Sequence, residues 1–176
     1  MRVISLNTWG NRAGHEKVLD FIRAHKEVDI FCLQEVWEGG ADEAPRWSDN
    51  IDTAMLTNIG KVLESHQVFF RAQFRDFYGL AMFVKNDLRV LEEGEVFVYG
   101  EKGWEHDESK GNHARNIQWV KLETPQGIRT IINFHGLWIG GAGKVDNPER
   151  MEQAERIAKF LRGVENPHVF VGDFNL

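Results

Sequence analysis

The run His168-Val-Phe-Val-Gly-Asp-Phe-Asn-Leu176 is apolar until it reaches two polar side chains, Asp173 and Asn175. Side chains two positions apart on a strand share a face, so we expect both to point the same way. Three earlier apolar runs also end on residues able to bind a metal or a phosphate: Val3 to Asn7, Asp29 to Glu35 and Thr130 to His135. We therefore predict four strands that bring Asn7, Glu35, His135, Asp173 and Asn175 to one rim.

Helical segments connect these strands in two pairs. The first runs from about His15 to His25, and its apolar face consists of Val18, Leu19, Phe21 and Ile22. The second has Asp146 or Asn147 as its cap, Pro148 in its first turn and Gly163 at its end. Its apolar stripe is Met151, Ala154, Ile157, Ala158 and Leu161. A crossover helix makes its flanking strands parallel, so both pairs present their C-terminal ends, where open α/β sheets bind ligands.

The middle of the chain has a different pattern. Residues 36–52 read as a surface loop anchored by Trp37 and Trp47, and residues 51–65 as a further helix. Short apolar segments between Val68 and Phe134, separated by turn residues such as Gly79, Gly94 and Gly100, predict antiparallel strands. The polar insert of residues 101–114 contains His106 and His113, for which the alternatives are contact with substrate or metal and, as the stronger expectation, a solvated loop.

Composition limits the class of protein. The 176 residues, 42% of them hydrophobic, suffice for one domain. The net charge of -6 differs from the positive charge of proteins that bind duplex DNA through many lysines. The single cysteine, Cys32, lies in an apolar strand and is expected in the core. The sequence shows neither a membrane-length apolar run nor a signal-like segment, so the expected location is cytoplasmic.

The polar strand ends indicate phosphate chemistry. Glu35 and Asp173 are hard oxygen donors, and Asn7 and Asn175 add amide oxygens, a set that suits Mg²⁺ or Mn²⁺ held mostly by water and substrate phosphate. His135 fits a catalytic role or that of a hydrogen-bonded strand end, and Arg115 a phosphate contact or an exposed ion pair. A single Asp or Asn at a strand end is usually a turn residue, but four such ends on two matching units favour a site.

The motifs Leu6-Asn-Thr-Trp9, Leu33-Gln-Glu-Val36, Asn133-Phe-His135 and Gly172-Asp-Phe-Asn175 resemble, in order and position, those of the endonuclease/exonuclease/phosphatase superfamily with the deoxyribonuclease I-like fold. The resemblance implies a four-layer α/β sandwich of two face-to-face mixed sheets with outer helices. It also implies that Glu35 binds the divalent metal, that Asn7 helps to hold metal or phosphate, and that Asp173 and Asn175 orient the attacking water and the phosphate. His135 would contact the scissile phosphate, and Arg115 is a weaker match.

Members of this superfamily continue past Gly-Asp-Phe-Asn into closing strands and a terminal Ser-Asp-His motif that supplies the general base. Residues 1–176 contain no equivalent of that motif. We therefore expect a single domain, residues 1–176, whose second sheet is incomplete and which is inactive by itself. The parent protein is expected to be a Mg²⁺-dependent hydrolase of a phosphate ester, with a nucleic acid, a nucleotide or a small phosphodiester as substrate; the alternative is a non-catalytic binding or scaffold protein that retains the fold.

Overall fold

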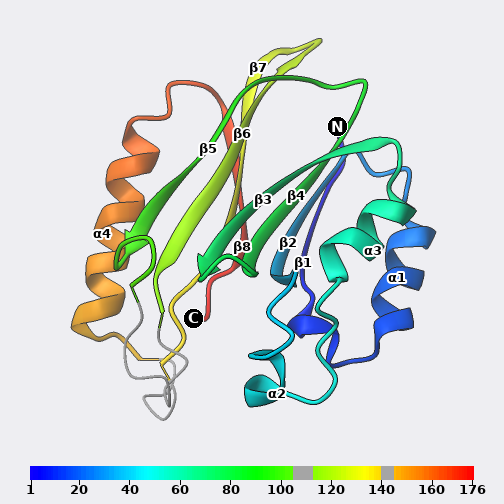
Figure 1. Ribbon diagram of the computed structural model, residues 1–176. Coiled ribbons are helices and arrows are strands. Elements are labelled where there is room, and N and C mark those ends of the chain that lie inside the picture. Colours follow the sequence, from blue (N-terminus) through cyan, green and yellow to red (C-terminus); the bar gives the residue numbers. More distant parts are fainter. Residues whose placement is uncertain (105–112, 140–144) are drawn as a thin grey trace.

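The computed structural model describes residues 1–104, 113–139 and 145–176, and two four-stranded sheets form its centre (Figure 1). Sheet A has the strand order β1-β2-β4-β3 and sheet B the order β5-β6-β7-β8. The strands are β1 (Val3–Asn7), β2 (Ile30–Trp37), β3 (His66–Phe74), β4 (Tyr78–Lys85), β5 (Arg89–Tyr99), β6 (Arg115–Thr124), β7 (Gly127–His135) and β8 (His168–Asp173).

Helices cover the outer faces of both sheets, which completes the four layers (Figure 1). Two helices, α1 (His15–Ala24) and α3 (Met55–Val62), pack on sheet A. The helix α4 (Pro148–Arg162) packs on sheet B. A 3-10 turn η1 (Trp9–Asn11) and the short helix α2 (Ala44–Trp47) lie in the loops that follow β1 and β2. The expected four-layer α/β sandwich is confirmed.

The two strand-helix-strand units are parallel pairs, as predicted. In sheet A, β1 pairs with β2 so that Asn7 lies opposite Gln34. In sheet B, β7 pairs with β8 so that His135 lies opposite Asp173. All other neighbouring strands are antiparallel. The C-terminal ends of the parallel strands therefore place their polar residues at the same end of the sandwich.

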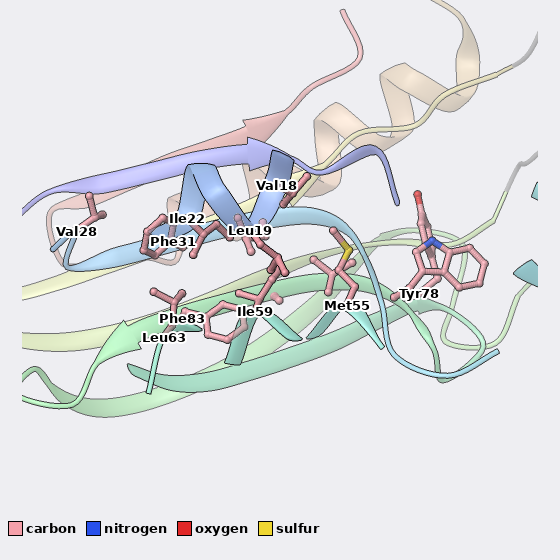
Figure 2. Packing of buried hydrophobic residues seen from close by; sticks show 14 of the residues in the cluster. Val18, Leu19, Ile22, Val28, Phe31, Met55, Ile59, Leu63, Tyr78 and Phe83 are labelled. Atoms are coloured by element: carbon pink, nitrogen blue, oxygen red, sulfur yellow. The ribbon is translucent and has the colours of Figure 1, made fainter. Parts of the chain in front are cut away.

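The core has three apolar layers because strand side chains alternate between two faces. From β2, Phe31 and Leu33 pack under α1 and α3, whereas Ile30 and Cys32 face sheet B. Figure 2 shows the first layer, in which side chains of α1 and α3 meet Phe31 and Phe83. A third layer lies between sheet B and α4. Cys32 is completely buried, as expected.

A band of amides interrupts the apolar layer between the sheets. Gln34 donates to Asn133 across the sheets at 2.7 Å, and Asn133 donates to the carbonyl oxygens of Leu33 at 3.0 Å and Ala81 at 3.3 Å. Gln118 accepts from Asn133 and donates to the carbonyl of Phe69. Hydrogen bonds are directional, so this band fixes how the two sheets face one another.

Three details differ from the predictions, and the first is that Gly79 lies inside β4 and not between two strands. Gly94 does not separate two strands, because β5 is continuous and the bare glycine accommodates the Trp119 ring, whose Cζ2 lies 2.7 Å from the position of a Cβ. On α4, Asn147 caps and Gly163 ends the helix as expected, but Met151 and Ala154 are exposed. The buried face is instead centred on Gln153 and continues through Ile157, Phe160 and Leu161.

None of the helices within the described ranges has both the length and the apolar character needed to cross a bilayer.

Candidate active site

The side chain of Asn7 joins the two sheets at the C-terminal ends of the parallel strands. Its Nδ2 atom donates to Glu35 Oε1 at 3.0 Å and to Asp173 Oδ2 at 2.8 Å. Its Oδ1 atom accepts from the backbone N–H of Trp9 at 2.8 Å, which determines the orientation of the amide. One amide group therefore connects the carboxylates of β2 and β8. The structure brings Asn7, Glu35 and Asp173 together as the strand pattern predicted.

Glu35 reaches this position because β2 contains an irregularity. The register with β4 shifts between Leu33 and Val36, and Glu35 adopts a φ of 58°. A left-handed glutamate is uncommon, and bulges re-aim side chains next to functional sites. The hydroxyl of Thr8 donates to the carbonyl oxygens of Gln34 at 2.9 Å and Glu35 at 3.0 Å, so the distorted backbone keeps its hydrogen bonds. Thr8 is buried and was not singled out in the sequence.

Burial raises the pKa of the Glu35 carboxyl, and the nearby charge of Asp173 raises it further. The hydrogen bond from Asn7 and the charges of Arg12 and Arg115 act in the opposite direction. Two carboxylates close together in a partly buried place disfavour each other's ionised form. A cation placed between them would relieve this repulsion.

His135 ends β7 with its imidazole buried beside these carboxylates. Its Nε2 atom lies 3.9 Å from Glu35 Oε1. Burial, reinforced by the charge of Arg115, lowers the pKa of His135 to about 3, although Asp173 acts to raise it. The imidazole is therefore neutral at physiological pH, and its approach to Glu35 is not an ion pair. Its Nδ1 atom is buried and has no hydrogen-bond partner in the described part of the chain.

Gly136 connects the ends of β7 and β8. Its N–H donates to the carbonyl of Asp173 at 2.7 Å, and its own carbonyl accepts from Asn175 Nδ2 at 3.0 Å. The expectation that Asn175 points the same way as Asp173 along a strand is wrong, because β8 ends at Asp173 and Asn175 has a φ of 55°. The backbone N–H of Asn175 instead donates to Asp173 Oδ1 at 3.0 Å. Asn175 thus supports the carboxylate through its backbone.

Arg115 lies buried below the same loop. Its Nε atom donates to the carbonyl of Gly136 at 3.1 Å, and its Nη1 atom contacts His113 Nε2. The expectation of a solvated His113 is wrong, since His113 is buried and its ring packs against Trp47, Phe74 and Tyr78. An aromatic cluster below the rim explains this burial. His106 lies outside the described residues.

The donor set fits a divalent cation in part. In the described portion of the chain, no three His, Cys, Asp or Glu side chains gather as a metal cluster. Glu35 and Asp173 nevertheless supply two carboxylates around one amide nitrogen. Mg²⁺ is commonly held by one or two carboxylates together with water and substrate phosphate, so two are enough.

Three further residues lie near the centre and were not among the strand-end residues predicted for the site. Tyr78, at the start of β4, is buried, and burial together with the charge of Glu35 raises the pKa of its phenol. Trp9 lies two residues after Asn7 and is 54% exposed. Arg12 acts electrostatically on both Glu35 and Tyr78. The left-handed turn that places Trp9 and Arg12 follows no simple periodicity, so no sequence pattern indicates it.

The fold and this centre define a four-layer α/β sandwich with an acidic, amide-bridged centre at one end of its two sheets. Residues 4–176 match the sequence model of the Endonuclease/Exonuclease/phosphatase family. The chain belongs to this family. A search among curated proteins gave no significant match.

Solved structures of family members share the fold. An endonuclease/exonuclease/phosphatase from Bacteroides vulgatus superposes with a TM-score of 0.68 at 20% identity, over 99% of this chain and 66% of that one. The mannosyl-6-phosphatase Bt3783 of Bacteroides thetaiotaomicron VPI-5482 gives 0.64 at 20% identity, over 99% and 65%. A humanized TDP2 of D. rerio gives 0.70 at 17% identity, over 99% and 62%. The chain therefore spans slightly less than two thirds of each of these proteins.

Proposed function

We propose that the protein is a metal-dependent hydrolase of phosphate esters, with Mg²⁺ or Mn²⁺ as its cofactor. The observation that carries the proposal is the single amide nitrogen of Asn7 that contacts both Glu35 and Asp173. Membership of the Endonuclease/Exonuclease/phosphatase family and the likeness to a mannosyl-6-phosphatase support a phosphate ester as the substrate class. When bound, the metal would neutralise charge on a phosphoryl oxygen and lower the pKa of a water molecule.

The residues have separate roles in this proposal. Glu35 would hold the metal. Asn7 would add an oxygen ligand if its amide turned so that its oxygen faced the ion and not the N–H of Trp9. Asp173 would orient the attacking water, with its carboxylate held by the backbone N–H of Asn175. His135, neutral and buried, would offer an N–H to the scissile phosphate rather than a charge. Arg115 would contribute positive charge from below the Gly136 loop.

Hydrolysis of chromogenic monoester and diester phosphates tests the proposal. Bis(p-nitrophenyl) phosphate and p-nitrophenyl phosphate are supplied with Mg²⁺, with Mn²⁺ or with a chelator. Residues 1–176 are compared with any longer natural chain that contains them. In the longer chain we expect metal-dependent release of p-nitrophenol that Glu35→Gln removes and that Glu165→Gln, at an exposed position, leaves unchanged. Turnover that persists in Glu35→Gln would contradict the proposal.

A further inference from the structure

Arg12 is a half-buried arginine at the rim. Among the described residues its buried Nε atom has no hydrogen-bond partner, and its guanidinium forms no salt bridge with any of them. Arginines elsewhere on the surface, such as Arg23, Arg71 and Arg89, pair with carboxylates. Burying a charged group without a partner is costly, so a guanidinium left in this state points to a ligand that completes its hydrogen bonds.

A short chain of hydrogen bonds ties Arg12 to the acidic centre. The backbone N–H of Arg12 donates to the carbonyl of Trp9 at 2.9 Å, and the N–H of Trp9 donates to Asn7 Oδ1 at 2.8 Å. Asn7 in turn contacts both carboxylates. Arg12 is also close enough for its charge to favour the ionised form of Glu35. The guanidinium therefore lies beside the centre and not on a remote surface.

The Trp9 ring holds the guanidinium. The Cζ atom of Arg12 lies 5.9 Å from the centroid of the Trp9 ring, a cation–π distance. Trp9 adopts a φ of 52° and Gly10 a φ of 56°, so η1 turns in the left-handed region. A Cβ at Gly10 would lie 3.3 Å from Trp37 Nε1, which shows how closely η1 is seated. The packing of η1 against Trp37 therefore places the Trp9 ring, and Arg12 with it, at the rim.

Arg115, the arginine indicated by the sequence, is placed differently. It is 2% exposed, and its Nε and Nη1 atoms are engaged by Gly136 and His113. A planar guanidinium binds a phosphate best when two parallel N–H groups are available. Arg12 has such groups available, and Arg115 has already committed two of its donors within the protein.

We propose that Arg12, held against the Trp9 ring, binds a phosphate oxygen of the substrate at this centre. The proposal rests on the proposed function for the class of substrate. It also follows from charge, because an anionic ester that approaches Glu35 and Asp173 meets two carboxylates and needs a cation beside them. Arg12 supplies that cation from the protein, in addition to any bound metal. Trp9 acts as a positioning residue for the guanidinium.

The test measures binding without turnover. Inorganic phosphate is titrated in the presence of Mg²⁺ by isothermal titration calorimetry against wild type, Arg12→Gln, Arg12→Lys and Arg162→Gln. Arg162 is exposed at the end of α4 and serves as the matched control. Arg12→Gln removes the charge-assisted hydrogen bonds of the guanidinium, and phosphate affinity should therefore fall roughly tenfold to hundredfold. Arg12→Lys should lose less phosphate affinity, and Arg162→Gln should bind phosphate as tightly as the wild type.

Trp9 is tested in the same titration. Trp9→Phe should keep phosphate affinity close to that of the wild type because a ring remains below the guanidinium, whereas Trp9→Ala should weaken it. Equal affinity in Arg12→Gln and wild type would overturn the proposal, and so would a wild type that binds no phosphate. Failure of hydrolysis alone would remove the proposed function, while a phosphate site that depends on Arg12 would still stand.

Discussion

Gln34 on sheet A and Asn133 on sheet B form a 2.7 Å hydrogen bond in the buried space between the sheets. Gln34 immediately precedes Glu35, and Asn133 lies two residues before His135. The bond therefore sets the separation of the strands that carry the candidate active site. Both side chains are almost completely inaccessible to solvent, so water cannot replace a lost partner.

Replacing Asn133 by Leu should destabilise the fold. The change removes bonds to Gln34, to Gln118 and to two backbone carbonyls and leaves these groups unpaired. Each unsatisfied buried group costs about 1–3 kcal/mol, so we expect a loss of at least about 3 kcal/mol in urea unfolding. Gln126→Ala, in an exposed turn, should change stability little. The double variant Gln34→Leu/Asn133→Leu should recover part of the loss, and no recovery would contradict this account.

Magnesium should raise the melting temperature of the wild-type protein, because a ligand that binds only the folded state stabilises it. Glu35→Gln should abolish that increase, since the amide removes the charge that the ion neutralises. Differential scanning fluorimetry with and without Mg²⁺ measures both, and Glu165→Gln serves as the control. An unchanged response in Glu35→Gln would exclude Glu35 as a metal ligand.

The metal-free protein should lose stability as the pH falls below about 6.5. The pKa of His135 is 6.5 without the fold and about 3 within it, so over this window the unfolded chain binds a proton that the folded chain does not. The contribution of His135 is complete above pH 6.5 and decreases by up to about 1.4 kcal/mol per pH unit on acidification. Glu35, whose pKa is raised by the fold, acts in the opposite sense.

Urea titrations at several pH values, with a chelator present, check this dependence. His135→Gln should flatten the slope between pH 6.5 and about 3, and the exposed His168→Gln should retain it. If His135→Gln followed the wild-type curve, His135 would not be the group that becomes protonated on unfolding.

Gly172→Ala should destabilise the protein strongly. Gly172 has a φ of 149°, and a Cβ there would collide with the backbone oxygen of Phe134 on the adjacent strand β7. Backbone cannot move aside as a flexible side chain can, so β8 must shift away from β7. Gly60→Ala is the matched control, because a Cβ in that position of α3 meets nothing within 4 Å. It should raise the free energy of unfolding by about 0.5–1 kcal/mol in thermal or urea unfolding.

Periodicity was sufficient to predict the two parallel units, since apolar alternation and capped helices are local signals. The cap at Asn147, whose side chain accepts from the N–H of Arg150 at 2.9 Å, is such a signal. Apolar runs that end on a polar residue likewise predicted the strands that end at Asn7, Glu35, His135 and Asp173. The rule that parallel strands share an edge explains the meeting within each pair, and the packing of sheet A on sheet B brings the two pairs together.

Features that depend on distant neighbours could not be read in this way. Gly94 looks like a turn residue, but the Trp119 ring occupies its space within a continuous strand. His113 lies in a polar segment, and only the rings of Trp47, Phe74 and Tyr78 make its burial favourable. The buried face of α4 includes Gln153 because its side chain accepts from the N–H of Leu137 at 3.2 Å. In each case tertiary packing overrides the local pattern.

The bridge from Asn7 to Asp173 also constrains when the centre can form during synthesis. Its two ends are 166 positions apart in the chain. A ribosome that adds about 5–20 residues per second needs on the order of ten seconds to cover that interval. Residues 3–85 contain all four strands of sheet A and can fold first, whereas the carboxylate pair exists only once β8 has docked. The nascent chain therefore carries no assembled acidic centre until β8 has paired with β7 in sheet B.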